Sequence, residues 1–349
     1  MAKVLVAMSG GVDSSVAARI LLDQGHEVSG VTLELFSPEN RNRCADTAVQ
    51  DAKKVADKLG IRHFVYNFEE LFDEKVVRKF IQSYLDGKTP NPCIDCNRHI
   101  KFGKLIERAV LEGYDFVATG HYALIDKNAE TGRFQIRKAS DLSKDQSYVL
   151  YSLTQEQISR SLFPLGAMNK TEVREIAAGE GLINAGKPDS QDICFVPDGD
   201  YPAFIERKTP GIPGPGNFID LNGNTIGRHR GIIHYTIGQR RGIAVSFGKP
   251  MYVADKNAAD NTVTLAENSD LFASSLIARD VNFISIDRLE EPLRVSAKIR
   301  YNQKEQKACI TPGQNGTVRV DFDEPQRAIA PGQAVVFYDG DIVVGGGTI

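Results

Sequence analysis

The sequence predicts an α/β protein. We expect a doubly wound parallel-sheet domain, then a small central β-rich domain, then a C-terminal β-barrel. Three observations support this prediction. Apolar runs alternate with segments of helical spacing through residues 116–119, a Pro- and Gly-rich stretch interrupts the chain at residues 209–216, and short alternating strands follow it. We place the domains at residues 1–207, 208–268 and 269–349.

The first strand and the first helix meet at a glycine-rich turn. Residues 4–7 form a short apolar run, and helical spacing of apolar residues begins at Val12. Between them lies Ser9-Gly10-Gly11-Val12-Asp13-Ser14. The first N–H groups of a helix lack partners and lie at the positive end of its dipole, and glycine lets phosphate oxygens approach the backbone, so the turn is an anion site. The Asp13 carboxylate would repel phosphates unless it caps the helix or holds a cation, and we expect Mg²⁺.

The next elements continue the βαβ alternation. We expect strands at residues 26–35, 61–66 and 116–119, with a helix at residues 45–59. Ligands of such sheets bind at the carboxyl ends of the strands. Leu33 and Gly120, which end two of these strands, should therefore lie beside a bound nucleotide. A hairpin is expected at residues 127–137, turning at residues 130–132.

Five cysteines are too few, and odd in number, for a disulfide framework. Cys44 and Cys309 are interpreted as incidental thiols. Pro90 and Pro92 predict that no helix begins before about Asn97, which places Cys93 and Cys96 on a loop or in a first helical turn.

Thiols near a helix N-terminus with basic neighbours have a lowered pKa, so we expect Cys93 and Cys96 to be partly thiolate at neutral pH because Arg98 and Lys101 follow them. The Cys-x-x-Cys spacing is compatible with a redox pair, half of a zinc site or a catalytic pair. Zinc is disfavoured because Cys194 has no Cys or His within ten residues.

The second half of the chain has features of an RNA-binding surface. Residues 221–250 contain no Asp or Glu but five Lys and Arg, with His229, His234 and Tyr235 among them, which suits nucleic-acid phosphates. Six short strands between residues 276 and 344 indicate a closed or partly closed barrel. Within it, Arg300, Tyr301 and residues 331–333 could read RNA. The polar residues 141–148 could hold a sugar-phosphate backbone or form a solvated loop.

The composition is ordinary, with a formal net charge of -3, which neither favours nor excludes a polyanionic partner. No apolar run approaches about 18 residues. We therefore expect a cytoplasmic protein with no membrane partner.

Six motifs occur in one order along the chain. They are the Ser-Gly-Gly loop, Asn-Pro-Cys-x-x-Cys-Asn-x-x-Ile-Lys-Phe, Ala-Thr-Gly-His-Tyr, Lys-Asp-Gln-Ser-Tyr, Asp-Ser-Gln-Asp-Ile-Cys-Phe and Tyr-Thr-Ile-Gly-Gln-Arg-Arg-Gly-Ile. The loop resembles the pyrophosphate (PP) loop of the ATP pyrophosphatases. The whole set resembles the bacterial tRNA-specific 2-thiouridylases of that superfamily, which replace the C2 oxygen of the wobble uridine, position 34, with sulfur.

The resemblance implies roles for particular residues. It makes Cys96 the nucleophile and Cys194 the thiol that carries a persulfide. The implied ATP contacts are Ala7, Met8, Ser9, Gly10, Gly11, Val12, Asp13, Ser14, Leu33 and Gly120. The implied tRNA contacts are Asn91, Pro92, Cys93, His121, Lys144, Asp145, Gln146, Arg300, Tyr301 and Gln333. ATP and Mg²⁺ are the implied cofactors, and the implied partners are tRNA and a sulfur donor, either a persulfide relay or a cysteine desulfurase.

The implied chemistry uses both halves of the site. ATP adenylates the uracil C2 oxygen, the persulfide sulfur displaces AMP, and a Cys96–Cys194 disulfide remains to be reduced. This requires the two Cα atoms to approach within about 7 Å, and we expect residues 188–195 to be flexible enough for that approach.

Cys93 opens an alternative, because many family members have Asp at this position. Cys93, Cys96 and Cys194 could instead hold three irons of a [4Fe-4S] cluster. Two rival functions also stay open: an ATP-dependent amidating ligase with the same loop, and a non-catalytic nucleotide-dependent RNA-binding protein.

Overall fold

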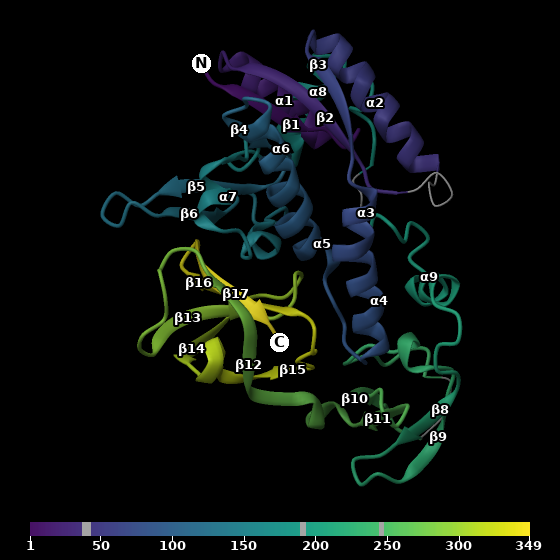
Figure 1. The fold of residues 1–349 in the computed structure, drawn as a ribbon. Helices are drawn as coiled ribbons and strands as arrows, with labels where there is room; N and C mark the ends of the chain where they lie inside the picture. Colours follow the sequence, from purple (N-terminus) through teal and green to yellow (C-terminus); the bar gives the residue numbers. More distant parts are fainter. Residues whose placement is uncertain (37–42, 189–192, 244–247) are drawn as a thin grey trace.

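The computed structural model describes residues 1–36, 43–188, 193–243 and 248–349, with side chains described from residue 47 in the second range. Figure 1 shows the parallel sheet at one end of the molecule, with the barrel and a small sheet at the other end. Helices α4 and α5 lie between them. The three-part fold class expected from the sequence is confirmed.

The first sheet is parallel, with the order β3-β2-β1-β4-β7. Its strands are β1 (Lys3–Ala7), β2 (Glu27–Glu34), β3 (Arg62–Asn67), β4 (Phe116–Ala118) and β7 (Ser161–Leu162). Val4 of β1 is in register with Val28 on one side and Phe116 on the other. Because the chain builds outward from β1 in both directions, the gap between β1 and β4 is the topological switch point at which such sheets bind ligands.

Helices cover this sheet. They include α1 (Val12–Asp23), α2 (Arg43–Leu59), α6 (Leu105–Leu111) and α8 (Lys170–Gly179). The α1 face that carries Val16 and Ala17 is fully buried, in one core with Val4 and Val6 of β1 and Val173 and Ala177 of α8. Helix α8 packs on α1. This contact brings residues that lie about 160 positions further along the chain next to the glycine-rich turn.

A second group of helices leads away from the sheet. It comprises α3 (Glu69–Phe72), η1 (Asp73–Val77), α4 (Arg78–Leu85), α5 (Pro92–Asp95) and η2 (Cys96–Lys104). Both η1 and η2 are π-helical, a conformation often found at functional sites. The expectation that no helix begins before Asn97 is wrong. Pro92 takes the first helical position, where its missing N–H has no partner to lose, and the Asn91 side chain accepts a hydrogen bond from the Cys93 N–H (3.1 Å).

The segment after β4 returns towards the barrel. The expected hairpin is confirmed as β5 (Ala123–Lys127) and β6 (Phe134–Lys138), with Gly132 in the turn at a φ of 68°. It joins the barrel sheet through the pairing of Arg137 with Ile342. The short helices η3 (Ser147–Leu150) and α7 (Gln155–Ser159) complete this part, whereas α9 (Tyr201–Lys208) packs in one core with Phe72 and Phe80 of the second helix group.

The central sheet has the order β10-β11-β8-β9. Its elements are β8 (Gly216–Ile219), β9 (Thr225–His229), η4 (Ile232–His234), β10 (Tyr252–Asn257) and β11 (Thr262–Ala266). Tyr235 and His229 are buried beside Phe218, so the expectation that Tyr235 is an exposed aromatic within a basic face is wrong. An aromatic ring buries a large apolar area, so in a sheet of this size the Tyr235 ring forms part of the core.

The C-terminal barrel is confirmed as six antiparallel strands, closed by the pairing of β12 with β17. The strands are β12 (Phe272–Phe283), β13 (Leu293–Lys298), β14 (Gln306–Pro312), β15 (Val318–Arg327), β16 (Ala334–Asp339) and β17 (Ile342–Thr348), with η5 (Asn268–Leu271) and η6 (Gln314–Gly316) as turns. Within the four described ranges, no helix has the length and apolar character that crossing a membrane requires.

Candidate active site

The glycine-rich turn after β1 is tightly built. Gly10 has a φ of 72°, and a Cβ there would lie 2.5 Å from the Ala48 carbonyl oxygen of α2. The Ser14 hydroxyl accepts a hydrogen bond from the Ser9 N–H (3.2 Å) and donates one to the Gly11 carbonyl (3.2 Å). Gly11 precedes α1 without any side-chain cap, so the first N–H groups of α1 keep their capacity to bind an anion.

Gly120 lies directly against this turn. A Cβ on Gly120 would be 2.8 Å from the Ser14 backbone nitrogen and 2.9 Å from the Asp13 carbonyl carbon. Leu33, at the end of β2, is partly buried, while the Met8 and Val12 side chains are almost fully buried. Of the residues for which we expect ATP contacts, Met8 and Val12 can therefore offer only their backbone groups.

Asp13 does not cap α1, because the residue at the cap position is Gly11. Its Oδ1 accepts hydrogen bonds from the Tyr122 hydroxyl (2.7 Å) and from Lys170 Nζ (2.7 Å). A cation does lie beside this carboxylate, and it is a lysine ammonium. No pattern in the sequence pointed to Lys170, because only the packing of α8 on α1 brings it to the turn.

Two more polar residues from the segment after α8 contact the turn. Lys187 Nζ donates to the Gly10 carbonyl (3.3 Å) and pairs with Asp51 (3.2 Å). Asn184 Nδ2 donates to the same carbonyl (3.2 Å) and to the Ser15 hydroxyl (2.8 Å). No motif in the sequence marked either residue.

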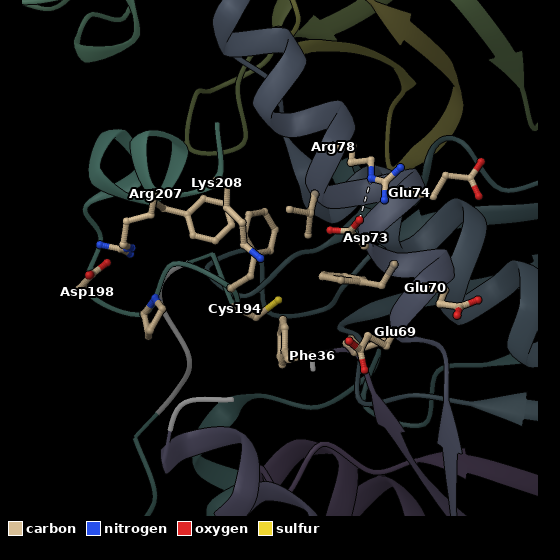
Figure 2. A pocket seen from close by; sticks show the side chains of 16 residues that line it. Phe36, Glu69, Glu70, Asp73, Glu74, Arg78, Cys194, Asp198, Arg207 and Lys208 are labelled. Atoms are coloured by element: carbon tan, nitrogen blue, oxygen red, sulfur yellow. Dashed lines mark hydrogen bonds and ion pairs between the residues drawn. The ribbon is translucent and has the colours of Figure 1, made fainter. Parts of the chain in front are cut away.

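Cys194 faces a cavity of about 880 Å³. Figure 2 shows its sulfur pointing into this cavity, with Phe36 nearby and the acidic residues of α3 and η1 on the opposite wall. Leu35 and Phe36 come directly after β2 and line the same cavity. The cavity therefore starts at the carboxyl edge of the parallel sheet, the edge that also carries the glycine-rich turn.

Cys96 is buried, at 8% exposure, in one apolar cluster with Phe195. Burial raises the pKa of the Cys96 thiol to about 11, although the charge of Lys101 opposes this shift. The expectation that Cys93 and Cys96 are partly thiolate is wrong for the free protein, because burial raises the pKa of both thiols and outweighs the helix start and the basic neighbours.

Cys194 is exposed to the cavity, and the protein packed around its thiol raises its pKa to about 12. Cys96 and Cys93 raise this pKa further, so the three thiols lie within electrostatic range of one another. All three are free cysteines. In the part of the chain that the structure describes, no group of three His, Cys, Asp or Glu residues is arranged to hold a metal ion. Cys44 and residues 189–192 lie outside the described side chains.

Several of the residues for which we expect tRNA contacts gather near Cys93. The Tyr301 hydroxyl donates to the Asp145 carbonyl (3.0 Å), and Gln333 Nε2 donates to the Thr89 carbonyl (2.8 Å), two residues before Asn91. Burial raises the pKa of Tyr301, and Asp145 and then Cys93 raise it further. The fold thus brings residues 91–93, 144–146, 301 and 333 to one region from three parts of the chain.

Three members of this set point into the protein. The Asp145 carboxylate accepts from the Ala139 and Ser147 N–H groups, and the His121 ring is buried against Phe102. Burial lowers the pKa of His121 well below its usual range, so its ring is neutral at physiological pH. Arg300 Nη2 donates to the Ala328 carbonyl (2.7 Å) and the Ile237 carbonyl (3.1 Å), which joins the barrel to the central sheet.

The basic stretch of the central sheet is partly neutralised. Lys249 pairs with Glu267. His234 Nε2 lies 3.2 Å from the Glu206 carboxylate, and burial lowers the pKa of His234, so its ring adds little positive charge at neutral pH. Four arginines of this stretch are exposed: Arg228, Arg230, Arg240 and Arg241. Arg228 and Arg230 lie at the end of β9, and Arg240 and Arg241 follow η4, so each offers an exposed cation that suits phosphates.

Family models match nearly the whole chain. The tRNA methyl transferase HUP domain matches residues 2–198, the tRNA methyl transferase PRC-barrel domain matches residues 203–267, and the aminomethyltransferase beta-barrel domain matches residues 273–349.

Curated relatives match over their full length. The tRNA-specific 2-thiouridylase MnmA of Acetivibrio thermocellus is 52% identical over 354 residues, which cover 99% of both chains. The enzyme of the same name from Clostridioides difficile is 53% identical and covers 99% of this chain and 98% of its own. Among solved structures, a 4-thiouridine synthetase in complex with RNA and ATP matches at a TM-score of 0.38 and 21% identity, covering 61% of this chain and 51% of that chain. At more than half identity over almost every residue, the chain belongs to the MnmA family of tRNA-specific 2-thiouridylases.

Proposed function

We propose that this protein is an ATP-dependent tRNA 2-thiouridylase that places sulfur at C2 of the wobble uridine, position 34. The observation that carries this conclusion is the shared edge of the parallel sheet. The glycine-rich turn follows β1, the cavity of Cys194 starts after β2, and Cys96 packs in one cluster with Phe195, next to Cys194. An ATP-activated base held at this edge would be within reach of both sulfur atoms.

The first step is the activation of the base. The C2 oxygen of uracil attacks the α-phosphorus of ATP, and the bond between the α-phosphorus and the bridging oxygen breaks. Pyrophosphate leaves with the electron pair. The N–H groups at the start of α1 and the hydroxyl of Ser9 offer donors to the phosphate oxygens, and Gly10 and Gly120 leave room for the nucleotide.

The second step is the transfer of sulfur. The terminal sulfur of a Cys194 persulfide attacks C2, and AMP leaves. Cys96 then attacks the Cys194 sulfur and releases the new thiocarbonyl, which leaves a Cys96–Cys194 disulfide that an external thiol reduces. The raised pKa of both thiols means that the free enzyme holds them mostly protonated, so the Cys96 thiol must lose its proton before it attacks.

Mg²⁺ fits this site as an ion carried by the nucleotide. Mg²⁺ usually keeps several waters and is bound by one or two carboxylates plus substrate phosphates. Asp13 is the carboxylate of the turn, and its Oδ1 is already held by Tyr122 and Lys170, which leaves its second oxygen for such an ion. When bound, Mg²⁺ would neutralise phosphate charge.

A [4Fe-4S] cluster does not fit the described residues. Cys93, Cys96 and Cys194 lie within electrostatic range, but they are not arranged as a ligand group. We therefore derive no step through a cluster and assign sulfur delivery to a protein donor, either a persulfide relay or a cysteine desulfurase, which would reach Cys194 from its cavity.

The tRNA is proposed to lie across the residues that gather near Cys93. Asn91, Pro92 and Cys93 would face the target base. Lys144, Gln146, Tyr301 and Gln333 lie on the surrounding segments, with the exposed arginines of the central sheet available to more distant phosphates. Asp145, His121 and Arg300 would support this surface from behind, through the hydrogen bonds that fix the loops.

The test is a reconstituted reaction. Purified protein is incubated with tRNA, ATP, Mg²⁺ and a persulfide source, and the nucleosides are analysed by mass spectrometry. We expect 2-thiouridine together with AMP and pyrophosphate. Cys96→Ser and Cys194→Ser should abolish thiolation, while Cys309→Ser, in β14 of the barrel, should not. An amidating ligase would keep its activity in Cys96→Ser, and a non-catalytic RNA-binding protein would release no pyrophosphate.

A further inference from the structure

The glycine-rich turn contains no cation of its own. Ser9-Gly10-Gly11-Val12-Asp13-Ser14 has one carboxylate and no Lys or Arg, whereas the P-loop motif includes a lysine that reaches the phosphates. Pyrophosphate leaves with several negative charges. Any cationic side chain that acts on the leaving group must therefore come from elsewhere in the fold.

Lys170 lies on one side of the turn. It is the first residue of α8, and its side chain is 12% exposed, which is well buried for a lysine. Its ammonium is 2.7 Å from Asp13 Oδ1, so it lies within the first turn of α1 and near the N–H groups expected to bind phosphate. An ammonium so placed can contact Asp13 and an incoming phosphate oxygen together, because it has three donors.

Lys187 lies on another side of the same turn. Its ammonium is 3.3 Å from the Gly10 carbonyl oxygen, and it is also paired with Asp51 of α2. Asn184 holds the same carbonyl, so the orientation of the turn does not depend on Lys187 alone. The fold thus delivers two ammonium groups to one anion site from a single segment, residues 170–187.

We propose that Lys170 and Lys187 bind the β- and γ-phosphates of ATP and neutralise the pyrophosphate that leaves. This inference rests on the adenylation step of the proposed function. As the bond to the α-phosphorus breaks, the electron pair moves to the β-phosphate oxygen, and the two ammonium groups stabilise that charge without giving up a proton. Both are therefore catalytic residues that act on the leaving group.

The test separates binding of pyrophosphate from binding of AMP. The variants are Lys170→Met and Lys187→Met, with Lys170→Arg as the conservative change. Lys58→Met is the matched control, because Lys58 also bridges α2 to the end of α8 through the Gly181 carbonyl (2.6 Å) but does not reach the turn. The affinities for inorganic pyrophosphate and for AMP are measured separately by calorimetry, each with Mg²⁺, on the full-length protein.

Each methionine variant should lose about tenfold to 100-fold in pyrophosphate affinity, the range expected for a hydrogen bond to a charged group, with AMP affinity within about twofold of the unmodified protein. Lys170→Arg should recover part of the loss, and Lys58→Met should bind both ligands normally. The proposal is overturned if pyrophosphate affinity is unchanged, or if AMP and pyrophosphate affinities fall together, since the lysines would then only shape the turn. Absence of 2-thiouridine formation in the unmodified protein would refute the proposed function while leaving this comparison intact.

Discussion

Gly120→Ala tests whether the end of β4 and the glycine-rich turn form one site. The new Cβ would lie 2.8 Å from the Ser14 backbone nitrogen, about 0.6 Å inside the 3.4 Å at which ordinary Cβ contacts begin. The nearest atoms are the Ser14 nitrogen and the carbonyl carbon and Cβ of Asp13, all fixed by the first turn of α1, so no flexible side-chain end can move aside. The turn and the strand end must separate.

The expected cost has two parts. Overpacking of this kind destabilises a protein by about 1–3 kcal/mol. Displacement of the phosphate-binding turn should lower the rate of AMP formation by about tenfold to 100-fold, since misplacement of reacting groups by about 1 Å can cost a hundredfold. The tRNA affinity should change less than the rate of AMP formation, because Gly120 has no side chain that could contact tRNA.

The assay is single-turnover release of AMP and pyrophosphate with tRNA and ATP, beside thermal unfolding of the same samples. Gly179→Ala is the control, because it is also a glycine-to-alanine change in this domain, and a Cβ there meets no atom within 4 Å. That variant should keep the rate and be slightly more stable, as alanine favours a helix. A Gly120→Ala protein with the normal rate of AMP formation would refute the placement of the nucleotide between β1 and β4.

Two further predictions concern the thiols and the tRNA surface. Because the pKa of Cys96 is raised to about 11, its alkylation by iodoacetamide in the free enzyme should be slow at pH 7.5 and rise about tenfold per pH unit up to pH 9. Lys101→Met removes a positive charge that lowers the pKa of Cys96, so this variant should be alkylated more slowly still. Lys104→Met should keep the rate of the unmodified protein, because Lys104 is paired with Glu107. Equal alkylation rates in the unmodified protein and both variants would contradict the effect of Lys101 on Cys96. Arg240→Ala combined with Arg241→Ala should weaken tRNA binding and reduce its salt dependence by up to about two counterions, and an unchanged salt slope in filter binding would place the tRNA elsewhere.

Patterns that depend on neighbours in the chain were predictable from the sequence. The strand that ends at Ala7, the helix that begins at Val12 and the barrel strands follow from apolar periodicity, and the structure confirms them. The hairpin that turns at Gly132 could likewise be predicted from residues that are neighbours in the chain. The βαβ alternation placed Gly120 at the carboxyl end of a strand, and in the structure Gly120 lies directly against the turn.

What failed depended on burial and on distant parts of the chain. Pro92 was interpreted as a helix breaker, although at the first helical position it is compatible with the helix that Asn91 caps. The pKa of Cys96 was expected to fall because its neighbours in sequence are basic, but the amount of protein around the sulfur is a property of the tertiary structure. Lys170 and Lys187 reach the turn only because α8 packs on α1, and no local pattern records that contact.

The most direct test of the account is a single turnover without reductant. Protein loaded with one persulfide on Cys194 is mixed with tRNA, ATP and Mg²⁺, and nucleosides, nucleotides and cysteine peptides are counted by mass spectrometry. We predict one 2-thiouridine, one AMP and one pyrophosphate per protein, with a disulfide between Cys96 and Cys194. Thiolation that proceeds with Cys96 still a free thiol, or without the formation of AMP, would contradict it.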